Sequence, residues 1–189
     1  MVDKHLKSLL DEADHHMEKS LEWLRHEFTA IRAGRATPTM IENVRVEYYG
    51  SQMPLNQVAS ISAPQPDLLI VQPWDRSALT DVEKGIRSAN IGLNPSNDGT
   101  FIRIPVPPLS EERRRDLVKS TKSRGEDAKI AIRNIRREVK DKIKKTTEDE
   151  SISEDMRYEA EERLQKITDH YVHVVDQLLE RKETEIMEV

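Results

Sequence analysis

The chain has 189 residues, of which 34% are charged, 36% hydrophobic and only 4% aromatic, and its net charge is −5. This length suits one domain or two small ones, and the low apolar content is common in long helices that each bury one stripe. The absence of cysteine excludes a disulfide framework and a thiolate metal site. No apolar run reaches the length that spans a membrane, and the N-terminal residues form no secretory segment, so we expect a cytoplasmic protein.

The charge is unevenly distributed along the chain. Residues 110–147 carry 14 basic and 7 acidic side chains, a net charge of +7. Residues 148–189 carry 5 basic and 14 acidic side chains, a net charge of −9. One cationic segment beside an anionic one indicates a polarised surface.

The first predicted element is a long helix. Between Leu6 and Ile31, apolar residues recur at every third or fourth position, which is the period of an amphipathic helix. Gly34 suits a C-terminal cap and Pro38 forbids continuation. We therefore predict one helix of about 28 residues, about 42 Å long.

The middle of the chain has a different pattern. Short β-branched or aromatic runs at residues 44–50, 57–63, 67–73 and 100–106 are bounded by turn residues and predict four strands. Residues 77–89 predict a short helix that begins near Ser77 or Thr80, and residues 94–99 predict a turn. Together they indicate a small α/β unit. We expect Trp23 and Trp74 to pack rather than to have a further role.

Two more long helices are predicted in the last 80 residues or so of the chain. Ser110 is a suitable N-cap for a helix that continues to about Thr147, weakened only by Gly125. Its apolar stripe is Leu117, Thr121, Ala128, Ile132, Ile135, Val139 and Ile143. After a break, Ser151 or Ser153 begins a last helix. The stripe of that helix is Met156, Ala160, Leu164, Ile167, Tyr171, Val174 and Leu178.

These elements predict an α+β fold with two domains. Isolated amphipathic helices are marginal in water, so the three stripes should meet in one long antiparallel bundle. We assign residues 1–31 and 108–189 to this three-helix bundle and residues 36–104 to a small β/α/β domain inserted in it. Hinges are expected near 32–36 and 104–108, with Arg35, Ala36, Pro105 and Pro107 as hinge residues.

The cations of the second long helix share one sector of its surface. At about 100° per residue, they lie beside the core face with only Glu126 among them. The set is Lys122, Lys129, Arg133, Arg136, Arg137, Lys140 and Lys144. Asp127, Glu138 and Asp141 fall on the opposite flank. Charged helix faces are most often solvated or paired at i,i+4, but this separation of signs favours a partner with dense negative charge.

Both a nucleic acid and an acidic protein fit such a stripe. Guanidinium groups pair bidentately with phosphate, which suits a nucleic-acid backbone. The low aromatic content disfavours stacking on single-stranded bases, so structured RNA read by shape and backbone fits better.

The motifs of common enzymes are missing. The sequence has no phosphate-binding loop, no G-x-G-x-x-G and no G-x-S-x-G. His170 and His173 are one turn apart, but no metal-ligand spacing accompanies them. We expect no catalytic residue, no metal, no cofactor and no enzymatic activity.

Several linked motifs resemble one known family across the whole chain. They are IRAGRATP, VEYYG, PLNQVASI, GLNPSNDG, IRIPVPPLSEERRRDLVK and AIRNIRRE, followed by ISEDMR and KETEIMEV. In this order and spacing they are similar to the ribosome recycling factor family. The chain departs from the family pattern at Ala33, where Thr is usual, and at Lys129, where many members carry Arg.

The resemblance implies an L-shaped protein about the size of a transfer RNA. It implies a factor that binds the post-termination ribosome and, with elongation factor G and GTP, promotes its dissociation into subunits, releasing mRNA and deacylated tRNA. Arg133 and Arg136 match the principal contacts to large-subunit ribosomal RNA. The other candidate contacts are Arg137, Lys129, Lys122, Lys140, Arg32, Arg35 and Arg114. We expect a monomer that has no membrane partner.

Two alternatives follow from the residues without the motifs. One is a protein-interaction or chaperone-like helical module whose acidic helices carry the function. The other is a hydrolase with a pocket in residues 40–104.

Overall fold

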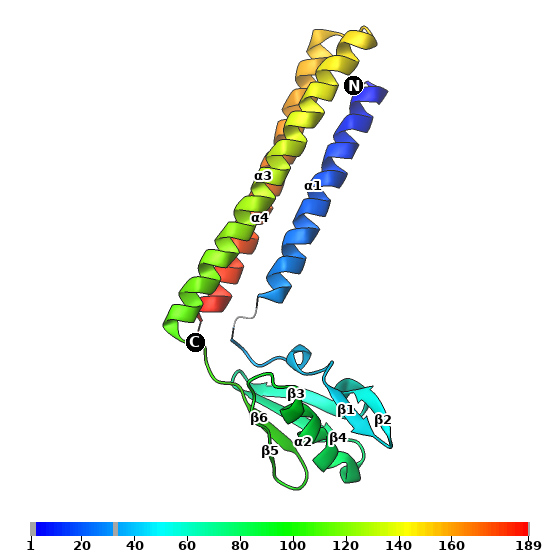
Figure 1. Cartoon of the computed structure of the whole chain (residues 1–189). Coiled ribbons are helices and arrows are strands. Elements are labelled where there is room, and N and C mark those ends of the chain that lie inside the picture. Colours follow the sequence, from blue (N-terminus) through cyan, green and yellow to red (C-terminus); the bar gives the residue numbers. More distant parts are fainter. Residues whose placement is uncertain (1–2, 32–33, 189) are drawn as a thin grey trace. The chain divides into compact units, whose positions relative to one another are not determined.

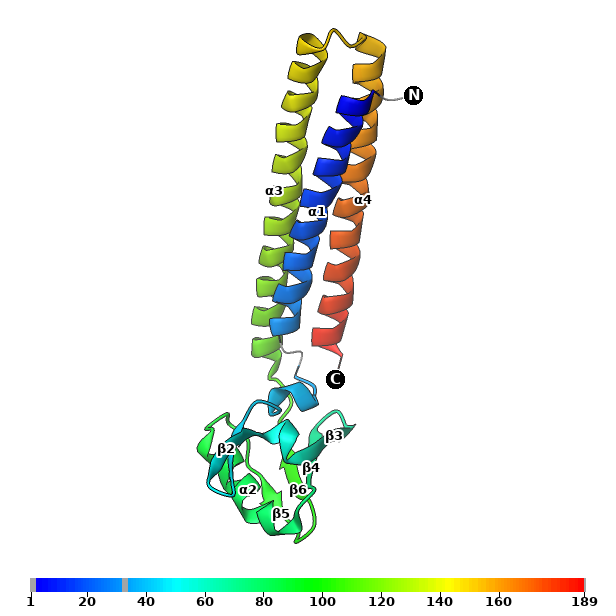
Figure 2. The same ribbon diagram turned by 90° about the vertical axis from the view of Figure 1, so that its right-hand side faces the viewer.

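The structure is a computed structural model that describes residues 3–31 and 34–188 (Figures 1 and 2). The chain divides into two compact units. One is helical, and the other is built on β-strands and spans Gly34–Ser110. Among the described residues, no helix is both long and apolar enough to cross a membrane.

The helical unit consists of α1 (Lys4–Ala30), α3 (Glu111–Asp149) and α4 (Glu154–Met187). All three pack against one another, and α3 runs antiparallel to both α1 and α4 (Figures 1 and 2). The prediction of three long helices in an antiparallel bundle is therefore confirmed. Ser153 is the N-cap of α4, since its hydroxyl accepts a hydrogen bond from the Met156 amide at 3.4 Å.

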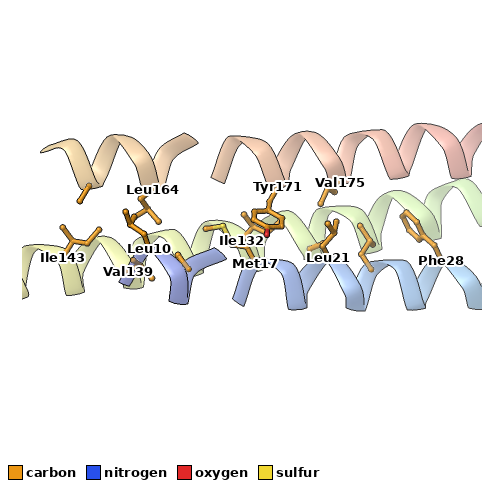
Figure 3. Packing of buried hydrophobic residues seen from close by; sticks show 14 of the residues in the cluster. Leu10, Met17, Leu21, Phe28, Ile132, Val139, Ile143, Leu164, Tyr171 and Val175 are labelled. Atoms are coloured by element: carbon orange, nitrogen blue, oxygen red, sulfur yellow. The ribbon is translucent and has the colours of Figure 1, made fainter. Parts of the chain in front are cut away.

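The core of this unit is continuous along the three helices (Figure 3). Every apolar residue of the first predicted stripe is buried, from Leu6 to Ile31. Two details of the α4 stripe are wrong: Met156 is exposed, and Val175 is fully buried while Val174 is only partly buried. A step of three or four residues from Tyr171 reaches either valine, so the packing of α4 against its neighbours decides between them.

Small and polar residues adapt α3 and α4 to close packing. Gly125 is buried, and a Cβ added to it would lie 2.6 Å from both Cδ atoms of Leu179 on α4. Gly125, which weakens the helical pattern, therefore lets α4 pack close to α3. The buried hydroxyls of Thr121, Thr147 and Thr168 each donate to the carbonyl four residues earlier, at 2.7–2.8 Å, so none of them is left unpaired.

The second unit contains two antiparallel sheets and one helix. β1 (Arg45–Tyr48) pairs with β2 (Ser51–Pro54). The larger sheet has the order β3-β4-β6-β5, formed by β3 (Ala59–Gln65), β4 (Leu68–Pro73), β6 (Ile102–Pro105) and β5 (Ser96–Asn97). Helix α2 (Leu79–Ser88) contributes Val82 and Ile86 to a core that includes Leu69 and Ile104.

All four predicted strands are present, but the sequence did not predict β2 and β5. β2 is polar and ends in proline, so it lacks the pattern of a buried strand. It forms because Tyr49 (φ 48°) and Gly50 (φ 78°) make a two-residue turn that returns the chain beside β1. β5 lies in the predicted turn at residues 94–99 and pairs with β6.

The predicted short helix of this unit is confirmed: α2 begins at Leu79, between Ser77 and Thr80, and directly follows a short 3-10 turn. Asp75 caps that turn by accepting from the Ser77 amide at 2.9 Å. Trp23 and Trp74 pack only in part, since they are 43% and 67% exposed.

Candidate nucleic-acid interface

The predicted cations of α3 lie in two rows along one side of the helix. Lys122, Lys129, Arg136 and Lys140 form the inner row, because each reaches a side chain of α4. Arg133, Arg137 and Lys144 form the outer row and are exposed. The regular spacing on one long helix brings all seven side chains to the same face.

The three lysines of the inner row have carboxylate partners on α4. Lys140 Nζ lies 3.3 Å from Glu161 Oε2, and Lys122 Nζ lies 3.9 Å from Glu183 Oε1. Lys129 pairs with Asp176. The positive charge of the predicted cationic sector is therefore compensated at these three positions by acidic residues of the next helix.

Arg136 is the exception in the inner row. Its Nη1 donates to the side-chain oxygen of Gln165 at 3.0 Å, and Gln165 Nε2 donates to Asp169 Oδ1 at 2.7 Å. Gln165 is a neutral amide, so it orients the guanidinium without compensating its charge. Arg136 thus has a neutral partner at the seam where its lysine neighbours have carboxylates.

The outer row carries most of the remaining uncompensated charge. Arg133 Nη1 lies 3.2 Å from Glu126 Oε1, in an exposed pair within α3 that contributes about 0–1 kcal/mol. Within residues 3–31 and 34–188, Arg137 and Lys144 have no ion pair or hydrogen bond of their side chains. Arg133, Arg136 and Arg137 therefore form a compact arginine cluster on which no carboxylate of α1 or α4 lies, and we call these three residues the open arginines.

The other candidate contacts lie apart from this cluster. Arg114, near the start of α3, donates from Nη1 to the Met187 carbonyl at 3.2 Å, where a cation stabilises the C-terminal end of α4. Arg35 is exposed in the second unit. Arg32 lies outside the described residues.

All four predicted hinge residues belong to the second unit. The Ala36 amide donates to the Pro66 carbonyl at 2.7 Å, and Pro105 is the last residue of β6. Pro107 is exposed beyond that strand. A Cβ added to Gly34 would lie 2.7 Å from Leu109 Cγ, so the two connecting segments are in close contact at this point. A hinge motion itself stays a prediction.

Two features of the described residues bear on metal binding and on a pocket in the second unit. Among the described residues, no three His, Asp or Glu side chains are placed to hold a metal ion. A groove of about 490 Å³ in the second unit is lined by Met40, Asn43, Val44, Arg45, Gly85, Ser88, Ala89 and Ile91. These residues include a serine but no histidine or carboxylate that could activate it.

The sequence analysis missed the α4 side chains of this interface. Gln165, Asp169 and Asp176 are polar positions of an amphipathic helix, and the net charge of −9 in residues 148–189 was the available signal. That signal does not say which acid faces which cation, because the register between α3 and α4 is set by core packing.

The fold and the interface define a class: a chain of two units whose candidate site is a charged helix face rather than a catalytic pocket. The sequence profile of the family "Ribosome recycling factor" matches residues 24–187. The ribosome-recycling factor of Salinibacter ruber is 57% identical over 189 residues, and the match covers the full length of both chains. That of Thermus thermophilus is 50% identical over 96% of this chain and 98% of its own length.

Solved structures agree with the sequence comparisons. A solution structure of the ribosome recycling factor is 42% identical, with a TM-score of 0.72, over 99% of this chain and 100% of that one. A second match, with 49% identity and a TM-score of 0.60, covers 97% of this chain and 99% of its own. It is described as models for the T. thermophilus ribosome recycling factor and the E. coli elongation factor G bound to the E. coli post-termination complex. The chain belongs to the ribosome recycling factor family.

Proposed function

We propose that this protein binds the post-termination ribosome through the open arginines and, together with elongation factor G and GTP, promotes dissociation of the ribosome into subunits. Dissociation releases mRNA and deacylated tRNA for a new round of translation. The protein acts in the cytoplasm as a monomer, without a cofactor and without catalysing a reaction itself.

The arrangement of Arg133, Arg136 and Arg137 is the observation that carries this proposal. A guanidinium group can make two parallel hydrogen bonds to one phosphate, which a lysine cannot. Three such groups on a rigid helix match a row of phosphates along one strand of structured RNA, with no need for base stacking. Large-subunit ribosomal RNA is the proposed target.

We infer a different role for the second unit. A recycling factor without a nucleotide site needs mechanical work from a partner, and elongation factor G supplies it by hydrolysing GTP. We infer that residues 36–104 form the domain that receives this work, and that bending near residues 32–36 and 104–108 lets it move relative to the helical domain. The solved structure described as a recycling factor and elongation factor G bound to a post-termination complex supports the partnership with elongation factor G.

The binding step is tested by removing one open arginine. We expect Arg136→Ala to weaken binding to post-termination ribosomes by about 1–3 kcal/mol, the range of a charge-assisted hydrogen bond. If three phosphates are neutralised, a plot of log affinity against log salt should have a slope of about −2 to −3. Arg163→Ala is the control, because it removes one positive charge from α4, where Arg163 pairs with Glu159 at 2.7 Å.

The functional step is measured by light scattering as ribosomes split into subunits. The wild-type protein should split them only with elongation factor G and GTP present, and Arg136→Ala should do so only at higher protein concentration. Splitting by the variant that equals the wild type at every concentration and salt would contradict the proposed contact. Full activity of Arg133→Glu, with a nuclease-resistant protein partner, would favour the interaction-module alternative.

A further inference from the structure

The acidic side chains of α4 are placed against the cations of α3 in a selective way. Along the seam, Glu161, Asp176 and Glu183 each face a lysine. Arg136, by contrast, faces the neutral side chain of Gln165. The three lysines of the inner row are therefore paired with carboxylates, whereas Arg136 faces an amide and keeps its positive charge.

Ion pairs of this kind contribute little to folding. In each pair one side chain is more than half exposed, namely Lys122 (64%), Lys140 (58%) and Asp176 (53%), and pairs open to solvent stabilise proteins by only about 0–1 kcal/mol. The partner of Asp176, Lys129, is 17% exposed, so that pair is the least open of the three. The carboxylate nevertheless accepts the same ammonium hydrogen bonds that an RNA phosphate would accept, and it compensates the same positive charge. Each pair must be broken, or must tolerate a second anion, before the lysine can bind RNA.

We propose that α4 is a built-in competitor for RNA phosphate: its carboxylates mask Lys122, Lys129 and Lys140, and Gln165 leaves Arg136 open. The masked lysines suppress binding to RNA of arbitrary sequence, which depends on the total number of available cations. The open arginines then select RNA whose phosphates match their spacing. Specificity then has two sources: the arginines of α3 bind the matching RNA, and the carboxylates of α4 prevent the lysines from binding other RNA.

Gln165 is the residue on which the selection depends. Its amide oxygen accepts from Arg136 while its nitrogen donates to Asp169, so the amide has a fixed orientation. A glutamate at this position would have the same size but would compensate the charge of Arg136. The assignment of Gln165 rests on the proposed function, whereas the masking of the lysines is a property of the chain alone.

The mask is tested on a duplex RNA of 20 or so base pairs and arbitrary sequence, with no ribosome present. The double variant Asp176→Asn/Glu183→Gln frees Lys129 and Lys122. We expect it to bind the duplex about tenfold more tightly at low salt, and the slope of log affinity against log salt should steepen by about 1.4–1.8 for two further phosphate contacts.

The matched control is Asp127→Asn/Glu138→Gln. It removes the same two charges and the same residue types, but from the flank of α3 that is opposite the cations. Among the described residues, neither of these carboxylates has an ion pair or hydrogen bond. The control should bind the duplex less than about threefold more tightly, with an unchanged slope, because only the overall charge differs. Equal gains for the two double variants would overturn the masking.

The open position is tested on post-termination ribosomes with Gln165→Glu. We expect about tenfold weaker binding, since the new carboxylate pairs with Arg136. Gln177→Glu is the control, because Gln177 is an exposed residue of α4 without a side-chain hydrogen bond among the described residues. Equal binding by the two variants would overturn the role of Gln165.

The duplex experiment and the ribosome experiment distinguish a failure of this inference from a failure of the proposed function. If Arg136→Ala binds ribosomes normally, the proposed function fails while the duplex arm still reports on the mask. If the duplex arm shows no effect but Arg136→Ala weakens ribosome binding, the mask fails alone. Circular dichroism melting of each variant confirms that a change in affinity is not a change in folding.

Discussion

The helical unit and the second unit differ in what specifies their structures. The helical unit is made of helices of 27, 39 and 34 residues, each defined by one repeating apolar stripe. The strands of the second unit have two to seven residues. Turns with positive φ, such as that at Tyr49 and Gly50, determine which strands meet.

The polar side chains of the two units consequently do different work. On α3 the charged side chains lie outside the core, and the charge of the open arginines is available for binding. In the second unit they hold turns: Asp75 accepts from the Ser77 hydroxyl and amide and from the Tyr49 hydroxyl at 2.7–2.9 Å. These hydrogen bonds, the one from the Ser77 hydroxyl foremost, lower the pKa of Asp75. Its contribution to stability is present above the ordinary aspartate pKa and is lost as the pH falls through the lowered value.

Charge on the surface of the helical unit can therefore be changed without much effect on folding. There, stability depends on the core stripe and affinity depends on the outer face. In the second unit, removal of a polar group also removes a turn. The predictions below test this division, beginning with the largest expected effect.

The stripe of α3 is tested by Ile132→Ala. Ile132 is fully buried between the three helices (Figure 3), and we expect the free energy of unfolding to fall by about 2–5 kcal/mol, because a cavity is left. Urea denaturation followed by circular dichroism measures the loss. Ile130→Ala, two residues away and 46% exposed, should cost less than about 1 kcal/mol. Similar costs for both would show that the stripe does not dominate the stability of this unit.

The turns and connections of the second unit are tested by two glycine substitutions. Gly50 (φ 78°) has no atom within 4 Å of an added Cβ, so Gly50→Ala should cost about 1–2 kcal/mol from backbone strain alone. Gly34 (φ 80°) has similar strain, and its Cβ would in addition meet Leu109 Cγ at 2.7 Å. We therefore expect Gly34→Ala to cost more than Gly50→Ala in thermal unfolding. Equal costs for the two variants would mean that Leu109 moves away freely.

The polar contact at the α1–α4 seam gives the smallest effect. Tyr171 is 5% exposed, and its hydroxyl donates to Asp14 Oδ1 at 3.0 Å. Tyr171→Phe should lower the free energy of unfolding by about 0.5–1.5 kcal/mol at neutral pH. A loss above that range would mean that this hydrogen bond, rather than the apolar stripe, holds α4 to α1.

The same variant has a pH signature. Burial, and then the hydrogen bond to Asp14, raise the pKa of Tyr171 above its ordinary value. Above pH about 10 the unfolded chain therefore loses this proton while the folded chain keeps it, and stability falls as the pH rises. Urea denaturation between pH 8 and 11 should show a shallower decline for Tyr171→Phe than for the wild type. Parallel curves would contradict the raised pKa.

Much of the helical unit could be predicted because the signals for it are local. The spacing of apolar residues from Leu6 to Ile31 reports which face of a helix is buried, whatever covers it. The Ser153 cap and the strands around residues 68–73 and 102–105 are likewise encoded in a few neighbouring residues. The sequence also placed seven cations on one face of α3, since their spacing alone determines that.

Only the tertiary structure decided which of those cations are open. The choice of Val175 over Val174, the pairing of Asp176 with Lys129 and the contact of Gln165 with Arg136 all depend on the register between α3 and α4. The same holds for β2, which forms because a turn returns it to β1. Periodicity along one helix contains no information on the sliding or rotation of its neighbour. Those are set by side chains from distant parts of the chain, such as Leu179 against Gly125, that interlock when the core closes.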